Sequence, residues 1–180
     1  MYVLKAVIIN GGYSLTSRLN GVQQEIKKLL EANDYEIDII HVNELNAHDF
    51  LTANYKGTDI LRSITKVEKS DVIFVLTPIF KGSYSGILKT FLDVLPRKAL
   101  VNKIVLPVAI GGSIAHLLAL EYSLKPVLSI LGATNISNPI YVVDHQIKAV
   151  ENGTFEVAEE IKERIESVWS QIRLVNAFSI

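Results

Sequence analysis

The stretch VLKAVIINGGYSLTSRLNGVQQEIKKLLEAN, residues 3–33, predicts a strand, a turn and a helix in succession. Residues 3–10 are mostly β-branched and nearly all apolar, which is typical of a strand buried on both faces of a parallel sheet. Residues 11–17 contain two glycines and predict a turn. Residues 18–33 place Val22, Ile26, Leu29 and Leu30 on one helix face. This unit indicates an α/β domain.

The same alternation continues along the chain. Further strands are expected at residues 36–42, 71–77, 103–110 and 134–143, and further helices at residues 59–69, 86–94, 111–131 and 155–174. Residues 43–56 predict a surface connection, and residues 78–85 predict a loop. Pro107 in the fourth strand should lie at a bulge or where the ladder lacks a partner, because proline has no amide hydrogen.

Five strands joined by helical crossovers predict a doubly wound sheet with helices on both faces, an α/β/α sandwich of three layers. The number of strand–helix units favours a flavodoxin-like, five-stranded parallel sheet over a six-stranded dinucleotide-binding fold. The length of 180 residues fits one domain, expected over residues 1–174, with a tail at residues 175–180.

The composition excludes several classes of protein. The net charge of −1 disfavours a nucleic-acid-binding surface, and also a strongly acidic electron carrier. The absence of cysteine excludes disulfides, thiolate nucleophiles and cysteine-ligated metal sites. Neither a secretory signal nor an apolar run of membrane-spanning length is evident. We therefore expect a cytoplasmic protein that binds neither membrane nor nucleic acid.

A ligand of such a sheet lies beyond the carboxyl ends of its strands. Three loops, at residues 11–20, 78–86 and 110–116, follow the first, third and fourth expected strands and are rich in glycine, serine and threonine. In the first loop, hydroxyl and amide side chains, the Arg18 charge and a helix N-terminus suit a phosphate group. The absence of GxxxxGK[ST] disfavours magnesium-dependent nucleotide hydrolysis, and the absence of GxGxxG weakens a dinucleotide interpretation. An ordinary helix cap and turn is the alternative to a phosphate site.

The other two loops suit a flat ligand. Phe80 and Tyr84 offer aromatic faces in the second loop, although such residues taken alone more often fill the core or an interface than contact a cofactor. In the third loop, the backbone amides of residues 111–113 could stabilise negative charge on a ligand edge. His116 is interpreted as a half-buried structural histidine. The four histidines show no metal-ligand spacing and no G-x-S-x-G motif occurs, so we expect neither a metal site nor a catalytic side chain.

Two longer motifs carry a resemblance to a known family. They are TPIFKGSYSGILKTFLDVL at residues 77–95 and LPVAIGGSIAHLLALEYSLKPVLSIL at residues 106–131. With these motifs the chain resembles the NAD(P)H-dependent FMN reductase family of flavodoxin-like proteins. More narrowly, it is similar to the flavin-reductase component of two-component alkanesulfonate monooxygenase systems.

The resemblance implies the positions of the FMN-binding residues. The phosphate would meet Ser17, Arg18 and Asn20, the isoalloxazine ring would lie along Pro78, Ile79, Phe80 and Lys81, and its pyrimidine edge would meet Gly111, Gly112 and Ser113. In the first loop the chain departs from the family pattern, because Gly12 replaces a serine and Ser14 replaces an arginine. The missing arginine puts the tightness of phosphate binding in question.

The resemblance also implies a reaction, in which NADPH or NADH passes a hydride to the flavin N5 and reduced FMN supplies a partner monooxygenase. The cofactors carry that chemistry, so no catalytic side chain is required. A quinone or azo-dye reductase with tightly bound FMN remains the main alternative. A non-enzymatic electron carrier and a binding or scaffold protein are further alternatives, and the fold alone does not decide among them.

The expected helix at residues 111–131 is apolar around most of its circumference, which indicates a subunit interface. Pro126 removes an amide donor and crowds the carbonyl of Tyr122, so we expect local widening there, for which a π-bulge is one form. In the resembled reductases, a tyrosine at this place marks such a bulge at a tetramer interface and is linked to flavin used as a released substrate. We therefore expect a homodimer or homotetramer. The alternative is a plain proline kink with a packed tyrosine.

Overall fold

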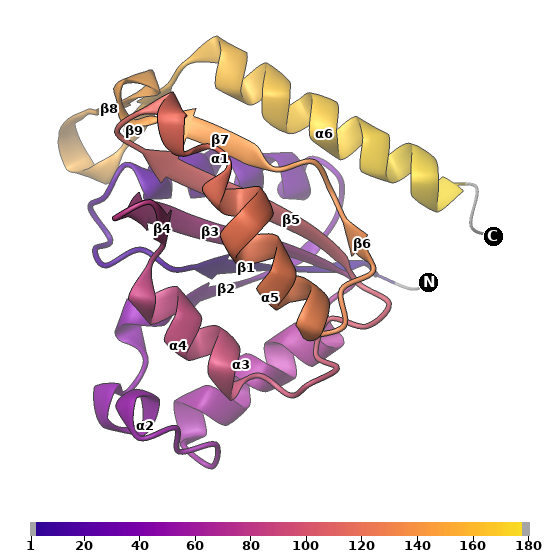
Figure 1. The fold of residues 1–180 in the computed structure, drawn as a ribbon. Helices are drawn as coiled ribbons and strands as arrows, with labels where there is room; N and C mark the ends of the chain where they lie inside the picture. Colours follow the sequence, from indigo (N-terminus) through magenta and orange to yellow (C-terminus); the bar gives the residue numbers. More distant parts are fainter. Residues whose placement is uncertain (1–2, 178–180) are drawn as a thin grey trace.

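The computed structural model describes residues 3–177 and contains a central parallel sheet of five strand positions (Figure 1). Its order is β2-β1-β3-β5, followed by a last position shared by β6 and β7. These strands are β1 (Lys5–Asn10), β2 (Glu36–His41), β3 (Val72–Phe80), β5 (Ile104–Gly111), β6 (Asn135–Ile136) and β7 (Ile140–Val143). The order confirms the doubly wound arrangement, with the switch between β1 and β3.

Helices cover both faces of the sheet, as expected. One face carries α1 (Leu19–Glu31) and α6 (Glu159–Ala177), and the other carries α3 (Thr58–Lys69), α4 (Gly86–Val94) and α5 (Lys125–Ile130). Successive residues of β1 point to opposite cores: Ala6 and Ile8 pack with α1 and α6, while Val7 and Ile9 pack on the other side. This burial on both faces explains why the strands are continuous apolar runs.

The predicted place of Pro107 is confirmed along one edge of β5. Strand β6 pairs with Ile104 and Val105, and β7 pairs from Val108 onward. Pro107 lies opposite the break between them, while it stays in register with Val75 of β3 on the other side. The missing amide hydrogen therefore coincides with a gap in the ladder, which divides the expected strand at residues 134–143 into two pieces.

The prediction of a loop at residues 78–85 is wrong in part. Strand β3 continues to Phe80 and pairs antiparallel with β4 (Ser83–Tyr84). The two turn residues, Lys81 and Gly82, both have positive φ angles, of 52° and 77°. Positive φ at both central positions is the signature of the type I′ hairpin turn, which matches the twist of the flanking strands.

The expected helix at residues 111–131 is divided into three segments. A 3₁₀ turn, η2 (Ile114–His116), is followed by a π-helical turn, η3 (Leu120–Leu124), and then by α5. Pro126 lies in the first turn of α5, where a missing amide is tolerated. The π-helical turn contains Tyr122 and confirms the widening expected from Pro126.

A hairpin precedes the last helix, which was expected to begin at residue 155. Strands β8 (Ile147–Ala149) and β9 (Phe155–Val157) pair antiparallel, and α6 begins at Glu159. The helix continues to Ala177, so it includes part of the expected tail at residues 175–180, and residues 178–180 lie outside the described residues. Between β2 and α3, the expected surface connection contains the short helix α2 (Ala47–Leu51). Within residues 3–177, no helix has the length and apolar character needed to cross a bilayer.

Candidate functional site

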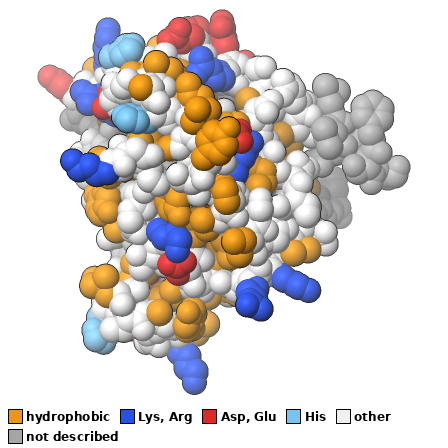
Figure 2. Space-filling model, in the orientation of Figure 1, with side chains coloured by type: hydrophobic (Ala, Val, Ile, Leu, Met, Phe, Trp, Pro, Cys, Tyr) orange, Lys and Arg blue, Asp and Glu red, His pale blue; other side chains and the backbone are white. Residues whose placement is uncertain are grey.

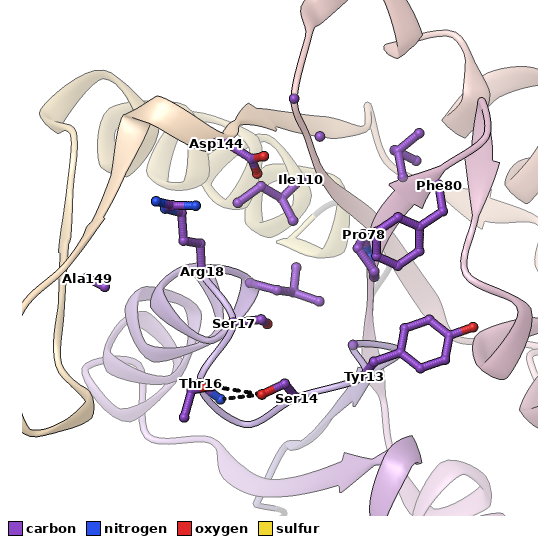
Figure 3. Close-up of a pocket in the computed structure, with 15 residues that line it drawn as sticks. Tyr13, Ser14, Thr16, Ser17, Arg18, Pro78, Phe80, Ile110, Asp144 and Ala149 are labelled. Atoms are coloured by element: carbon purple, nitrogen blue, oxygen red, sulfur yellow. Dashed lines mark hydrogen bonds between the residues drawn. The ribbon is translucent and has the colours of Figure 1, made fainter.

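A cavity of about 500 Å³ opens at the carboxyl ends of β1, β3, β5 and β7 (Figure 3). This is the edge where ligands of doubly wound sheets bind, and the volume lies within the usual range for small-molecule sites. Its walls come from the three predicted loops and from the segment after β7. The lining residues are Gly12, Tyr13, Ser14, Thr16, Ser17, Arg18, Leu19, Pro78, Ile79, Phe80, Ile110, Gly111, Gly112, Asp144 and Ala149.

Buried amide side chains set the shape of the first loop. Asn10 ends β1, donates from Nδ2 to Asn20 Oδ1 (3.0 Å) and Gln23 Oε1 (2.8 Å), and accepts from the Gly12 amide (2.8 Å). Asn20 in turn donates to the carbonyls of Ser14 (3.0 Å) and Ser17 (3.2 Å). Because both asparagines are almost fully buried, these bonds hold the loop against the start of α1.

Polar donors gather at the α1 end of the cavity. The hydroxyls of Ser14 and Thr16 are hydrogen bonded to each other at 2.8 Å, and no side chain caps the helix. The Asn20 and Gly21 amides donate to the carbonyls of Ser17 and Arg18 at 3.0 and 2.9 Å. The amides of Arg18 and Leu19, at the very start of the helix, are therefore the ones that can face a ligand, and the helix dipole favours an anion there. Arg18 donates from Nε to the carbonyl of Ile147 at 3.1 Å. That bond orients the guanidinium and leaves its terminal nitrogens to bind an anion.

The first two loops are joined through a buried serine. Ser85 donates from its hydroxyl to the Gly11 carbonyl at 2.6 Å, and its amide donates to Thr77 Oγ1 at 2.9 Å. Ser85 and Thr77 are both fully buried. Since buried polar groups are costly when unpaired, this network holds the carboxyl ends of β1 and β3 at a fixed separation.

The third loop is a flat stretch of backbone supported by Tyr141. A Cβ atom on Gly111 would overlap the hydroxyl of Tyr141, which donates to the Ser113 carbonyl at 2.8 Å. Burial raises the pKa of the Tyr141 phenol, and the Asp144 carboxylate raises it further, so the hydroxyl keeps its proton and remains a donor. Gly111 therefore permits the bond to Ser113, which fixes the backbone of the third loop.

An aromatic pair lies at the other end of the cavity from Arg18 (Figure 3). The rings of Tyr13 and Phe80 are 5.7 Å apart at 45°, and each residue is about half exposed. With Pro78 and Ile79 they make an apolar wall that faces the glycine backbone of the third loop. The cavity is thus polar near α1 and flat and apolar near β3.

Most of the predicted site residues line this cavity. They are Ser17, Arg18, Pro78, Ile79, Phe80, Gly111 and Gly112. Three others do not: Asn20 is buried beneath the first loop, Lys81 is in the hairpin turn, and Ser113 caps η2 by accepting from the Ala115 amide at 3.2 Å. Asn20 faces inward because its position on α1 points toward Asn10.

Sequence reasoning did not single out five of the lining residues, which are Tyr13, Leu19, Ile110, Asp144 and Ala149. Tyr13 lies within the first loop and could have been found as an aromatic residue among the expected donors. Asp144 directly follows the last strand, so extending the carboxyl-end rule to that strand would have found it. Ala149 has no signal in the sequence, because no element was expected over residues 144–154 and the second strand of its hairpin was expected to belong to the last helix. Across the described residues, no group of three or more metal-ligating side chains is present.

Comparison with known proteins gives one family and two informative structures. A family model described as NADPH-dependent FMN reductase matches residues 4–148. The chain is 39% identical over 161 residues to an FMN reductase (NADPH) of Pseudomonas putida, which covers 88% of this chain and 81% of the relative.

The solved structures agree with the architecture. The crystal structure of the NADH:FMN oxidoreductase EmoB, in its apo form, superimposes with a TM-score of 0.82 and 31% identity, covering 96% of this chain and 90% of that one. A flavodoxin from the domain Archaea superimposes with a TM-score of 0.59 and 12% identity, covering 94% of this chain and 99% of that one. The second likeness concerns the fold alone and confirms the flavodoxin-like prediction.

Proposed function

The chain belongs to the NADPH-dependent FMN reductase family, and we propose that it transfers a hydride from NADPH or NADH to FMN. The observation that carries this proposal is one cavity with two different ends. Arg18 and the uncapped start of α1 suit a phosphate, while Gly111, Gly112 and the apolar wall of β3 suit a planar ring.

The residues present fit FMN. Gly111 carries no Cβ atom that would collide with the buried Tyr141, so the third loop keeps the backbone course that lines the cavity. Ser17 and Arg18 would hold the phosphate, Pro78 to Phe80 would lie along the ring, and the amides of residues 111–112 would meet its polar edge. We propose that Asn20 acts indirectly, by holding the carbonyls of Ser14 and Ser17 in place.

When bound, FMN supplies the redox chemistry by accepting a hydride at N5. The chain's own residues position the reactants and exclude water. The amides of residues 111–112 would stabilise negative charge at the flavin edge. The half-exposed ring of Tyr13, beside Phe80, offers an apolar surface for the nicotinamide. The titratable residues of the lining are Tyr13, Arg18 and Asp144, and none needs to transfer a proton.

A steady-state assay tests this function. Purified protein is mixed with NADPH or NADH, and nicotinamide oxidation is followed while the FMN concentration is varied. We expect a rate that saturates with added FMN, since we propose that the flavin is a released substrate. Faster turnover with a quinone or an azo dye, together with FMN retained at one per chain, would favour the alternative reductase. Absence of oxidation with any acceptor would overturn the proposal.

We further propose that a second copy of the chain binds the exposed apolar face of residues 114–122. Ile114, Leu118 and Tyr122 are 54%, 53% and 78% exposed, while Leu120 and Leu124 of the same segment are buried. Figure 2 shows hydrophobic side chains gathered over the part of the molecule that carries η3 and α5 in Figure 1. An apolar cluster of this kind favours an oligomer. This face includes the end of the third loop, so association would support the site.

The variant Leu118→Asp is expected to dissociate the oligomer, because a carboxylate in an apolar contact loses its hydration without a partner. Sedimentation velocity at micromolar concentration should give a dimer or tetramer for the wild type and a monomer for the variant. Leu51→Asp is the matched control, since Leu51 is 82% exposed on α2 and should leave the assembly unchanged. A monomeric wild type would contradict the interface.

The cellular role follows from the activity. We propose that the protein acts in the cytoplasm as one domain over residues 1–174 and supplies reduced FMN to a flavin-dependent monooxygenase. The proposal is supported by the cysteine-free composition and by a reaction whose product is a diffusible reductant.

A further inference from the structure

The β8–β9 hairpin lies at the Arg18 end of the cavity, although almost all of it follows the residues that the family model matches. The match ends at residue 148, and Ala149 is the hairpin residue that lines the cavity. Figure 3 shows Ala149 beside Arg18, away from Pro78 and Phe80. The hairpin therefore borders the proposed phosphate position, not the ring.

Close packing fixes the hairpin against α1. A Cβ atom on Gly21 would lie 2.8 Å from Phe155 Cβ and 2.9 Å from Ile147 Cγ2, so the hairpin packs where α1 has no side chain. Gln24 also donates from Nε2 to the Gly153 carbonyl at 3.3 Å. These contacts indicate a fixed wall held by the helix whose N-terminus faces the cavity.

The pairing of the two strands separates their side chains onto two faces. Ala149 pairs with Phe155 and Ile147 pairs with Val157, while Lys148 pairs with Glu156 between them. Since side chains alternate along a strand, Ala149 shares the face of Ile147 and Phe155, which pack toward α1. Lys148 belongs to the opposite face, away from the cavity.

We propose that this hairpin is the end wall of the phosphate site, with Ala149 facing the phosphate monoester and the Ile147 carbonyl orienting Arg18. The inference rests on the proposed binding of FMN. A small neutral side chain at residue 149 leaves room for the phosphate. The carbonyl bond to Nε turns the terminal nitrogens of Arg18 toward the same place.

Binding of FMN and of riboflavin, which lacks the phosphate, tests the wall. Dissociation constants are measured by quenching of flavin fluorescence for the wild type, Ala149→Asp, Ala149→Lys and the control Lys148→Ala. Ala149→Asp should raise the dissociation constant of FMN about tenfold, because the carboxylate repels the phosphate, and Ala149→Lys should lower it. The dissociation constant of riboflavin should change less than about twofold in both variants. Lys148→Ala also lowers the net charge by one, but on the opposite face of the hairpin. It should leave the dissociation constants of both flavins within about twofold of the wild-type values.

The opposite signs of the two Ala149 variants distinguish a local charge effect from loss of folding. Equal changes in the dissociation constants of FMN and riboflavin, or no change in either, would overturn the proposal that the hairpin forms the end wall of the phosphate site. So would a wild type that binds riboflavin as tightly as FMN. Binding that follows the expected pattern in a protein without reductase turnover would instead overturn the proposed function and leave the wall supported.

Discussion

Gly111→Ala is expected to lower FMN-dependent nicotinamide oxidation by about a hundredfold. The new Cβ atom would overlap the Tyr141 hydroxyl and lie 3.4 Å from Ile79 Cβ, so either the third loop or the buried tyrosine must move. In enzymes, displacement of a positioning group by about 1 Å can lower the reaction rate by a factor of this size. Steady-state rates at varied FMN and NADPH would measure the loss.

A second substitution tests the cause of that loss. In the double variant Gly111→Ala, Tyr141→Phe the overlapping hydroxyl is gone, and the nearest ring atom, Cζ, lies at 3.2 Å, which needs only a small shift. The double variant should therefore be more active than Gly111→Ala but no more active than the single variant Tyr141→Phe, because both variants that carry Tyr141→Phe lose the hydrogen bond to the Ser113 carbonyl. Gly86→Ala is the matched control, because its Cβ would meet nothing nearer than 3.5 Å. Full activity in Gly111→Ala, or a double variant no more active than Gly111→Ala, would contradict the flat-backbone role.

Arg18→Gln is expected to raise the dissociation constant for FMN about thirtyfold, which is about 2 kcal/mol, and to leave riboflavin binding nearly unchanged. The guanidinium is oriented by the Ile147 carbonyl and is the cation among the residues that line the cavity. Its removal takes away charge-assisted hydrogen bonds to the phosphate. Fluorescence titration with both flavins gives the two constants.

Arg18→Lys separates charge from geometry. Lysine keeps the positive charge, but its single ammonium group cannot donate to the Ile147 carbonyl and also bind the phosphate through two parallel hydrogen bonds. We therefore expect an FMN affinity between those of the wild type and Arg18→Gln. Arg62→Gln on α3 makes the same substitution away from the cavity and should bind FMN as the wild type does. A riboflavin affinity that falls as much as that of FMN would show that Arg18 supports the fold and does not bind the phosphate.

The central strands β1, β3 and β5 were predictable because each is buried on both faces over most of its length. Residues such as Val7 and Ile8 face different cores, so the whole segment must be apolar and is visible without any partner. The turn at Lys81 and Gly82 was not predictable in the same way. A lysine with positive φ is uncommon, and its conformation depends on the pairing of Ile79 with Tyr84.

The same distinction applies to the site. Loops that follow buried strands could be placed at one edge of the sheet from topology alone, which identified Arg18, Phe80 and Gly111. Whether Asn20 faces the ligand or the core depends on how α1 is rotated against Asn10. That rotation is set by packing between elements distant in sequence.

The sequence by itself determined the parallel sheet, its five positions and the three loops that meet at the cavity, because periodicity and chain order are local properties. Only the tertiary structure decided which side chains line that cavity and what closes its ends. Phe155 lies in a strand and not in the last helix, where it packs against the bare backbone of Gly21. Contacts of this kind join segments more than a hundred residues apart, and no local pattern encodes them.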